Sequence, residues 1–144
     1  MAGADLSTED RMAIQQLAAR YNHAIDSGDG AAYAGTFVED GVLDAGQLVL
    51  EGRGALEQFA SAFPGSVHCP RHVATSLLID ADGDGDGDGD CDCKGAVLLA
   101  YVQMYALVGD PPRQTITASG TYTDSLVKLD EGWRFVRRTF TADA

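Results

Sequence analysis

The second half of the chain holds four long runs of β-branched and aromatic residues, which restrict its possible folds more than any other feature. Residues of this kind favour β-strands. The runs cover residues 71–80, 96–108, 114–129 and 133–141. The last two breaks, at 109–112 and 130–132, are short and rich in turn-forming residues, which predicts antiparallel neighbours. The sequence therefore predicts a sheet built mainly from long antiparallel strands.

The first 65 residues predict three helices and a small hairpin. Ser7 with Asp10 resembles a capping box, and an apolar stripe follows at helical spacing: Ile14, Leu17, Ala18, Tyr21 and Ile25. A second, short helix is expected to carry Tyr33 and Phe37, and a third to end at Pro64, with a hairpin over residues 42–50 between them. With a length of 144 residues, these elements predict one α+β domain over residues 1–144, with the helices on one side of a curved antiparallel sheet.

The formal net charge of −12 limits the kinds of molecule that the protein is expected to bind. Nucleic-acid binding needs clustered Lys and Arg, which this chain lacks, so no nucleic-acid partner is expected. No apolar run is long enough to span a bilayer, and the first ten residues have neither the basic nor the apolar part of a signal peptide. We therefore expect no membrane partner and a cytoplasmic location.

Residues 82–95 form an Asp/Gly-rich segment whose alternating Asp residues resemble those of a calcium-binding loop. An EF-hand loop needs a bidentate Glu at its twelfth position, but a loop that begins at Asp82 has Cys93 there, and the segment joins two expected strands. A flexible, self-repelling hairpin loop is the better interpretation. The three cysteines also lack zinc-site spacing, so we expect neither a metal site nor a cofactor.

Several stretches along the chain together resemble a known family. They read ARYNHAIDSGD at 19–29, RHV at 71–73, GTYTD at 120–124 and GWRFVR at 132–137. This pattern resembles SnoaL-like proteins of the nuclear transport factor 2-like superfamily, which includes scytalone dehydratase, bile acid 7α-dehydratase, ketosteroid isomerase and polyketide cyclases. The resemblance implies a cone-shaped fold with three N-terminal helices on the concave face of the sheet. It also implies an enzyme without a cofactor that acts on a small hydrophobic molecule.

The dehydratase branch of this family matches best at three positions. Its catalytic Asp and His fall on Asp26 and His72, and its tyrosine falls on Tyr21. Two further tyrosines of scytalone dehydratase fall on Ile25 and Ala45, so the resemblance does not extend to that enzyme itself.

Ketosteroid isomerase matches less well. The position of its general base falls on Ala45, and Asp44 is one residue away. Because a shift of one residue on a strand turns a side chain to the other face, an isomerase of this kind is a second alternative rather than the first expectation.

The residues themselves suggest an acid–base role for His72. Its expected neighbours on the same strand face are small, Ala74 and Ser76, whereas Val73, Leu77 and Ile79 are expected on the opposite face. An imidazole titrates near neutrality and acts as a base when a carboxylate fixes its tautomer. The other possible interpretation is a hydrogen-bonded histidine with a purely structural role.

Each of the three catalytic candidates has an expected role. His72 would remove a proton next to a carbonyl, Asp26 would orient it, and Tyr21 would donate a hydrogen bond to the oxyanion. Tyr21 and Asp26 are about 140° apart on a straight helix, so both reach one cavity only if the helix end loosens or the helix crosses the cavity mouth. The expected activity is that of a dehydratase or cyclase. The main alternative is a binding or association domain without catalysis.

Further residues are expected at the substrate. An apolar lining is predicted from Tyr33, Phe37, Phe59, Phe63, Met104 and Tyr122. Arg138, expected on one strand face with Arg134 and Val136, could hold an anionic group.

The strand at 96–108 is apolar on both faces, which predicts a cover on each side. A homo-oligomer, either a dimer or a trimer, would supply the second cover.

Overall fold

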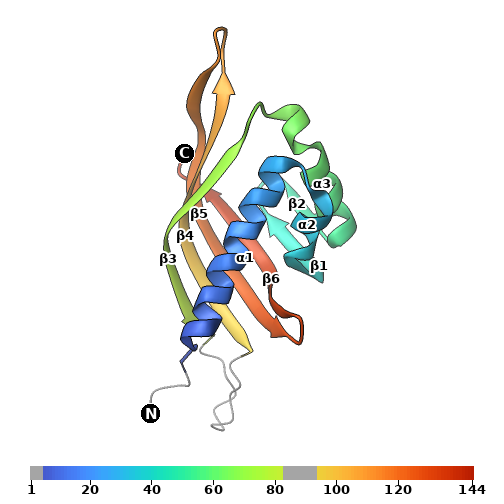
Figure 1. The fold of residues 1–144 in the computed structure, drawn as a ribbon, viewed down its shortest axis with the longest axis vertical. Coiled ribbons are helices and arrows are strands. Elements are labelled where there is room, and N and C mark those ends of the chain that lie inside the picture. The colour runs from blue at the N-terminus through green and yellow to red at the C-terminus, as the bar shows by residue number, and fades with distance from the viewer. Residues whose placement is uncertain (1–4, 83–93) are drawn as a thin grey trace.

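The computed structural model describes residues 5–82 and 94–144. Figure 1 shows a long curved sheet with the helices on one of its faces, and α1 runs across that face. Helices come first in the chain and the long strands last, as the sequence predicts. The elements are α1 (Thr8–Ser27), α2 (Gly30–Gly35), β1 (Phe37–Asp44), β2 (Val49–Glu51), α3 (Arg53–Ser66), β3 (Arg71–Ala81), β4 (Gly95–Val108), β5 (Arg113–Leu129) and β6 (Gly132–Ala142).

The six strands form one sheet in the order β2-β1-β6-β5-β4-β3. The neighbours β3, β4, β5 and β6 are antiparallel, which confirms the prediction for the four long strands. The hairpin of β1 and β2 joins this sheet through a parallel pairing of β1 with β6. The result is a mixed α+β fold. The predicted loop at residues 82–95 connects β3 to β4, and its residues 83–93 lie outside the described part of the chain.

Local caps set the ends of α1. The Ser7 Oγ accepts a hydrogen bond from the Asp10 amide at 3.0 Å, which confirms the predicted start. Gly28 adopts a left-handed conformation (φ 75°) that ends the helix, as glycine does readily. The predicted apolar stripe of α1 is buried, with Ile14 and Tyr21 at most 3% exposed. This stripe faces the sheet, so the core lies between α1 and the inner face of β3 to β6.

Phe37 lies at the start of β1 and not on the second helix, so that prediction is wrong. The Thr36 hydroxyl donates to the Tyr33 carbonyl at 2.7 Å and closes α2. The Thr36 carbonyl then accepts from the Phe135 amide at 2.9 Å, which joins the chain to β6. Phe37 pairs with Phe135 and is fully buried.

Extra residues in β3 and β6 change which side chains face the core. In β3 the pairing with β4 shifts between Thr75 and Leu78, and Ser76 has a positive φ of 54°. Leu77 and Ile79 therefore lie on the same face as His72, so their predicted place on the opposite face is wrong. These two residues are half-buried and buried, whereas Leu78 is exposed.

The shift in β6 is at Val136, which has no partner because Phe135 pairs with Leu126 and Arg137 with Ser125. Arg138 consequently shares the buried face with Phe135. The prediction that it lies beside Arg134 and Val136 is wrong, because one extra residue inverts the alternation.

Within the described residues, no helix combines the length and the apolar character needed to cross a membrane.

Candidate active site

Asp26 and His72 meet at the place where the end of α1 approaches the start of β3. The Asp26 Oδ1 lies 2.6 Å from the Nδ1 of His72, and the Asp26 Oδ2 accepts the backbone N–H of His72 at 2.9 Å. Their side chains are 12% and 13% exposed, so the pair is largely shielded from water. The structure thus brings together two residues that are 46 positions apart in the chain.

This double contact fixes the chemistry of the imidazole. A carboxylate only accepts hydrogen bonds, so the Nδ1 beside Asp26 carries the ring hydrogen. The Nε2 is then left with a lone pair and can accept a proton. Asp26 would also stabilise the imidazolium that forms. Because the second oxygen binds the backbone of the same residue, the carboxylate and the ring are held in a fixed relative position.

A small apolar cavity of about 170 Å³ lies at His72. Phe63 is one of its walls, and its ring centroid is 5.5 Å from that of the imidazole. The lining comprises Phe63, His72, Val102, Met104, Ala118, Tyr122 and Phe140. Of the predicted lining residues, the structure therefore places Phe63, Met104 and Tyr122 together with His72.

The other predicted lining residues do not lie on the wall of this cavity. Tyr33 and Phe37 are fully buried in the core, and Phe59 packs against Tyr33 with a centroid distance of 6.4 Å. The apolar stripes of the helices and the strands meet here in the hydrophobic core. These three positions are corrected from cavity wall to core.

Tyr21 also lies outside the lining of the cavity. It is 3% exposed, and its hydroxyl accepts a hydrogen bond from the hydroxyl of Tyr33 at 3.0 Å. α1 continues as a regular helix to Ser27, so Tyr21 points into the core while Asp26 points to β3. Tyr21 packs behind Tyr122, with ring centroids 6.0 Å apart. The phenol on the cavity wall is Tyr122.

Burial raises the pKa of Tyr122 well above its ordinary value, and the pKa of Tyr21 rises for the same reason. Both phenols therefore stay protonated at neutral pH, so each keeps a hydrogen that it can donate. Of these two phenols, Tyr122 is the one that lines the cavity at His72.

Arg138 lies behind Tyr122 and is fully buried. Its Nε and Nη2 donate to the two carboxylate oxygens of Asp124 at 2.9 and 2.7 Å, and its guanidinium carbon lies 3.7 Å from the centre of the Tyr122 ring. Burial by itself lowers the pKa of Arg138, but the facing Asp124 carboxylate raises it overall, so the guanidinium stays charged. Asp124 binds two nitrogens of this arginine, whereas its buried Nη1 has no hydrogen-bond partner among the described residues. Arg138 does not line the cavity at His72, and its anion-binding role stays a prediction.

A polar hollow of about 520 Å³ lies beside the same pair. Asn22 and Arg71 line it together with Asp26 and His72, and the buried Oδ1 of Asn22 has no hydrogen-bond partner among the described residues. Sequence reasoning missed Asn22 and Arg71. Their only signal is position, since Asn22 is four residues before Asp26 on the helix and Arg71 precedes His72.

Two other chemistries find no support in the described residues. No group of three or more His, Cys, Asp or Glu side chains is placed to hold a metal ion in residues 5–82 and 94–144. Asp44, the carboxylate nearest to the isomerase base position, accepts from the Gly46 amide at 3.0 Å and pairs with Arg137 at 2.5 Å, away from the cavity. Its hydrogen bonds with Gly46 and then Arg137 lower its pKa.

This curved sheet with helices on its inner face places the protein in the nuclear transport factor 2-like, or cystatin-like, class of folds. The class is shared by a nuclear transport factor 2-like protein from Novosphingobium aromaticivorans, with a TM-score of 0.80 and 22% identity over 94% of this chain and 82% of that one. More specifically, the SnoaL-like domain family matches residues 7–139, and the chain belongs to that family.

Two further structures are similar over most of the chain. One is a substituted form of Rv3472, a protein of unknown function from Mycobacterium tuberculosis, with 32% identity, a TM-score of 0.80, and coverage of 94% of this chain and 72% of that one. The other is a protein from Novosphingobium aromaticivorans that is named as a putative scytalone dehydratase. It has 22% identity and a TM-score of 0.76, and the match covers 94% of this chain and 85% of that one. A search of curated proteins gave no significant match.

Proposed function

We propose that this protein is a cofactor-independent acid–base enzyme, a dehydratase or cyclase that acts on a small hydrophobic molecule with a carbonyl group. The observation that carries the proposal is the Asp26–His72 pair at the wall of an apolar cavity. The carboxylate fixes the tautomer of the ring, which makes no other hydrogen bond within the described residues, and so leaves Nε2 as a base. Membership of the SnoaL-like family is consistent with such an activity.

In the proposed dehydration, the substrate carries a hydroxyl group on the carbon β to its carbonyl. The Nε2 of His72 removes a proton from the α-carbon, and the electron pair of that C–H bond forms an enolate. Tyr122 donates a hydrogen bond to the enolate oxygen. When the enolate collapses, the β-carbon–oxygen bond breaks and the imidazolium returns its proton to the departing hydroxyl. The products are an α,β-unsaturated carbonyl compound and water.

A cyclase would use the same residues for a different second step. The enolate formed by His72 would attack a second carbonyl carbon of the same chain, and the imidazolium would protonate the alkoxide that results. Asp26 has the same role in both reactions, because it stabilises the imidazolium in each case.

The volume of the cavity limits the part of the substrate that can be buried at His72. An engineered protein cavity of about 150 Å³ holds one benzene molecule, and the cavity here is of similar size, at about 170 Å³. We therefore propose that a single ring, or an aliphatic group of similar size, enters the cavity. The remaining, more polar part of the substrate would lie in the hollow at Asn22 and Arg71.

Proton exchange tests this proposal. The protein is incubated in deuterated water with a panel of monocyclic β-hydroxy ketones, and mass spectrometry measures both the deuterium in the substrate and the appearance of dehydrated product. We expect exchange or product with the natural protein and none with His72→Ala, which should keep its fold because the ring is at a cavity wall.

Binding without exchange or turnover, with the same affinity in His72→Ala, would support the non-catalytic alternative instead. With a β,γ-unsaturated ketone in place of the hydroxy ketones, migration of the double bond would support an isomerase that uses His72 and not Asp44.

A further inference from the structure

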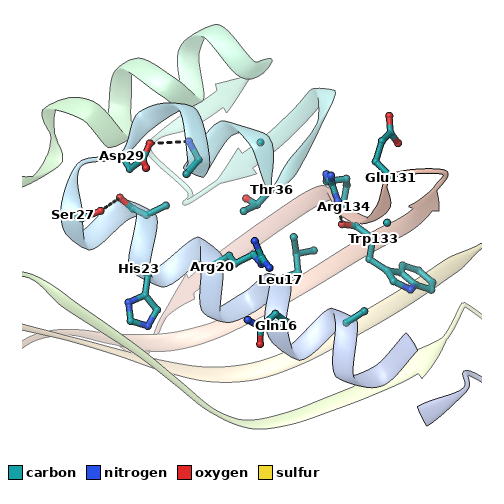
Figure 2. A pocket seen from close by; sticks show the side chains of 15 residues that line it. Gln16, Leu17, Arg20, His23, Ser27, Asp29, Thr36, Glu131, Trp133 and Arg134 are labelled. Carbon is teal, nitrogen blue, oxygen red and sulfur yellow. Dashed lines mark hydrogen bonds between the residues drawn. The ribbon is translucent and has the colours of Figure 1, made fainter. Parts of the chain in front are cut away.

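A groove on the outer side of α1 is separate from the apolar cavity at His72. Figure 2 shows it bounded by α1, by α2 and by the turn from β5 into β6, and its volume is about 630 Å³. The lining residues of α1 recur three or four positions apart, so one stripe of the helix forms a continuous wall. The groove shares no residue with the apolar cavity.

The floor of the groove is apolar and firmly held. It includes Leu17 and Trp133, which are 6% and 3% exposed. The indole N–H of Trp133 donates to Asp10 at 3.0 Å, and the Thr36 carbonyl accepts from the Phe135 amide at 2.9 Å. These bonds tie β6 to α1 and to the end of α2. The apolar floor is therefore preformed, and a ligand would have to order only the arginine side chains above it.

Two arginines line the groove without a carboxylate partner. Arg20 forms no hydrogen bond or ion pair within the described part of the chain, and Arg134 donates only to the neighbouring Trp133 carbonyl, at 2.7 Å. In a chain with a net charge of −12, free arginines in one groove are unexpected. In Figure 2 Arg20 extends from α1 and Arg134 from the start of β6.

The two acidic residues of the groove do not neutralise these arginines. Asp29 caps α2 by accepting from the Ala32 amide at 3.1 Å. Glu131 lies in the turn before β6, and its side chain points away from Arg134 in Figure 2. No ion pair joins either acid to Arg20 or Arg134.

We propose that this groove binds a small organic carboxylate. The apolar body of the ligand would lie on Leu17 and Trp133, and its carboxylate would be held between the guanidinium groups of Arg20 and Arg134. The fork of N–H donors on a guanidinium matches the two oxygens of a carboxylate. This site shares no residue with the apolar cavity at His72, but it adjoins the polar hollow beside the Asp26–His72 pair, because His23 and Ser27 line both.

The site carries its own reporter, because Trp133 is the only tryptophan in the chain. Its fluorescence is followed during titration with cyclohexanecarboxylate, which does not absorb in this range, and with the matched neutral cyclohexanecarboxamide. Inorganic phosphate is a third probe. We expect a saturable change with the carboxylate and at least a tenfold weaker effect with the amide, since a hydrogen bond to a charged group contributes about that factor.

Charge-matched variants complete the test. Arg20→Gln with Arg134→Gln should weaken carboxylate binding by about a hundredfold, or about tenfold for each arginine. Lys94→Gln with Arg113→Gln removes the same charge elsewhere and should leave binding unchanged. Glu131→Gln should tighten binding, because it removes a nearby negative charge. Circular dichroism checks each fold, and if the double variant unfolds, the exposed Arg20→Gln alone gives the measurement.

Equal affinities for acid and amide, tighter binding of phosphate, equal losses in the two double variants, or no fluorescence response would each overturn the proposal.

Discussion

Gly120 of β5 and Phe140 of β6 approach each other so closely that the first position has no room for a side chain. A Cβ on Gly120 would lie 2.6 Å from the Cε2 of Phe140 and 2.3 Å from the carbonyl oxygen of Thr141. Both distances are far below ordinary contact. Because Phe140 forms part of the cavity wall at His72, this glycine allows β6 to bring that ring to its place.

Gly120→Ala should therefore disturb both stability and the cavity. The added methyl group must displace the backbone of β6 or the Phe140 ring, and overpacking of this kind costs about 1–3 kcal/mol. Urea unfolding measures the loss. Gly65→Ala is the control, because a Cβ there meets nothing within 4 Å, so no loss is expected. Equal stability of Gly120→Ala and the natural protein would contradict the packing argument.

Asp26→Asn should remove activity while leaving the fold intact. The amide oxygen can still accept the backbone N–H of His72, but its NH₂ group would then face Nδ1. The ring hydrogen would move to Nε2, and the imidazole would no longer be a base toward the cavity. Loss of the correct tautomer costs about four orders of magnitude in a comparable triad, and we expect kcat to fall by about 10²- to 10⁴-fold here. Asp80→Asn, the same substitution at an exposed position of β3, is the matched control, and a kcat within twofold for Asp26→Asn would exclude the proposed role.

The long strands could be predicted from the sequence because their signals are local. The run at 133–141 and the turn before it locate β6, observed at Gly132–Ala142, to within one residue. The positions of Ser76 and Val136 could not be predicted, because a bulge depends on how two strands pair and leaves no mark in either strand alone. The faces assigned to Leu77 and Arg138 were wrong for this reason.

In the candidate site, too, local features could be predicted from the sequence and contacts between distant residues could not. The pairing of Asp26 with His72 was expected from resemblance to a family, since nothing in a spacing of 46 positions indicates contact. Apolar periodicity correctly predicted that Tyr21 is buried, but it does not tell a cavity wall from a filled core. The partner of Arg138 was also missed, because Asp124 looks like an ordinary surface residue until β5 and β6 are paired.

Removal of one partner from the buried Asp124–Arg138 pair should be severely destabilising. Asp124 is 2% exposed and Arg138 is fully buried, so Asp124→Ala leaves an uncompensated charge in the core. Such a change costs about 3–5 kcal/mol. A double replacement, Asp124→Leu with Arg138→Met, should recover much of the loss because no charge stays buried. Thermal unfolding of the two variants checks the prediction, and a double variant no more stable than the single one would contradict it.

The free energy of unfolding should depend on pH at low pH because of the carboxyl group of Asp10. Hydrogen bonds from Lys128 and Trp133 lower the pKa of this carboxyl from 3.8 to about 2. A group whose pKa is lower in the folded state stabilises the fold above its unfolded pKa and loses that effect as the pH falls toward the folded value. Allowing for partial exposure, we expect Asp10→Asn to cost about 1–2 kcal/mol at pH 7. Chemical denaturation should show this difference shrinking between about pH 5 and pH 2. A difference that is constant with pH would mean that charge plays no part.

The outer face of the sheet leads to a prediction of self-association. Apolar side chains gather there on β3 and β4, and all are more than 40% exposed: Val73, Leu78, Val97, Leu99 and Tyr101. Leu99 pairs with Leu78 and Tyr101 with Thr75, so these strands present a continuous surface that water would otherwise cover.

We propose that a second copy of the chain covers this surface. Leu99→Lys should then convert the oligomer to a monomer, because an isologous interface would receive the buried charge from both subunits. Met12→Lys is the matched control, since Met12 is 65% exposed on α1, away from the sheet. Light scattering coupled to size-exclusion chromatography measures the mass and separates a dimer from a trimer. A natural protein that is monomeric at about 100 μM, a concentration well above the Kd of a stable dimer, would overturn the prediction.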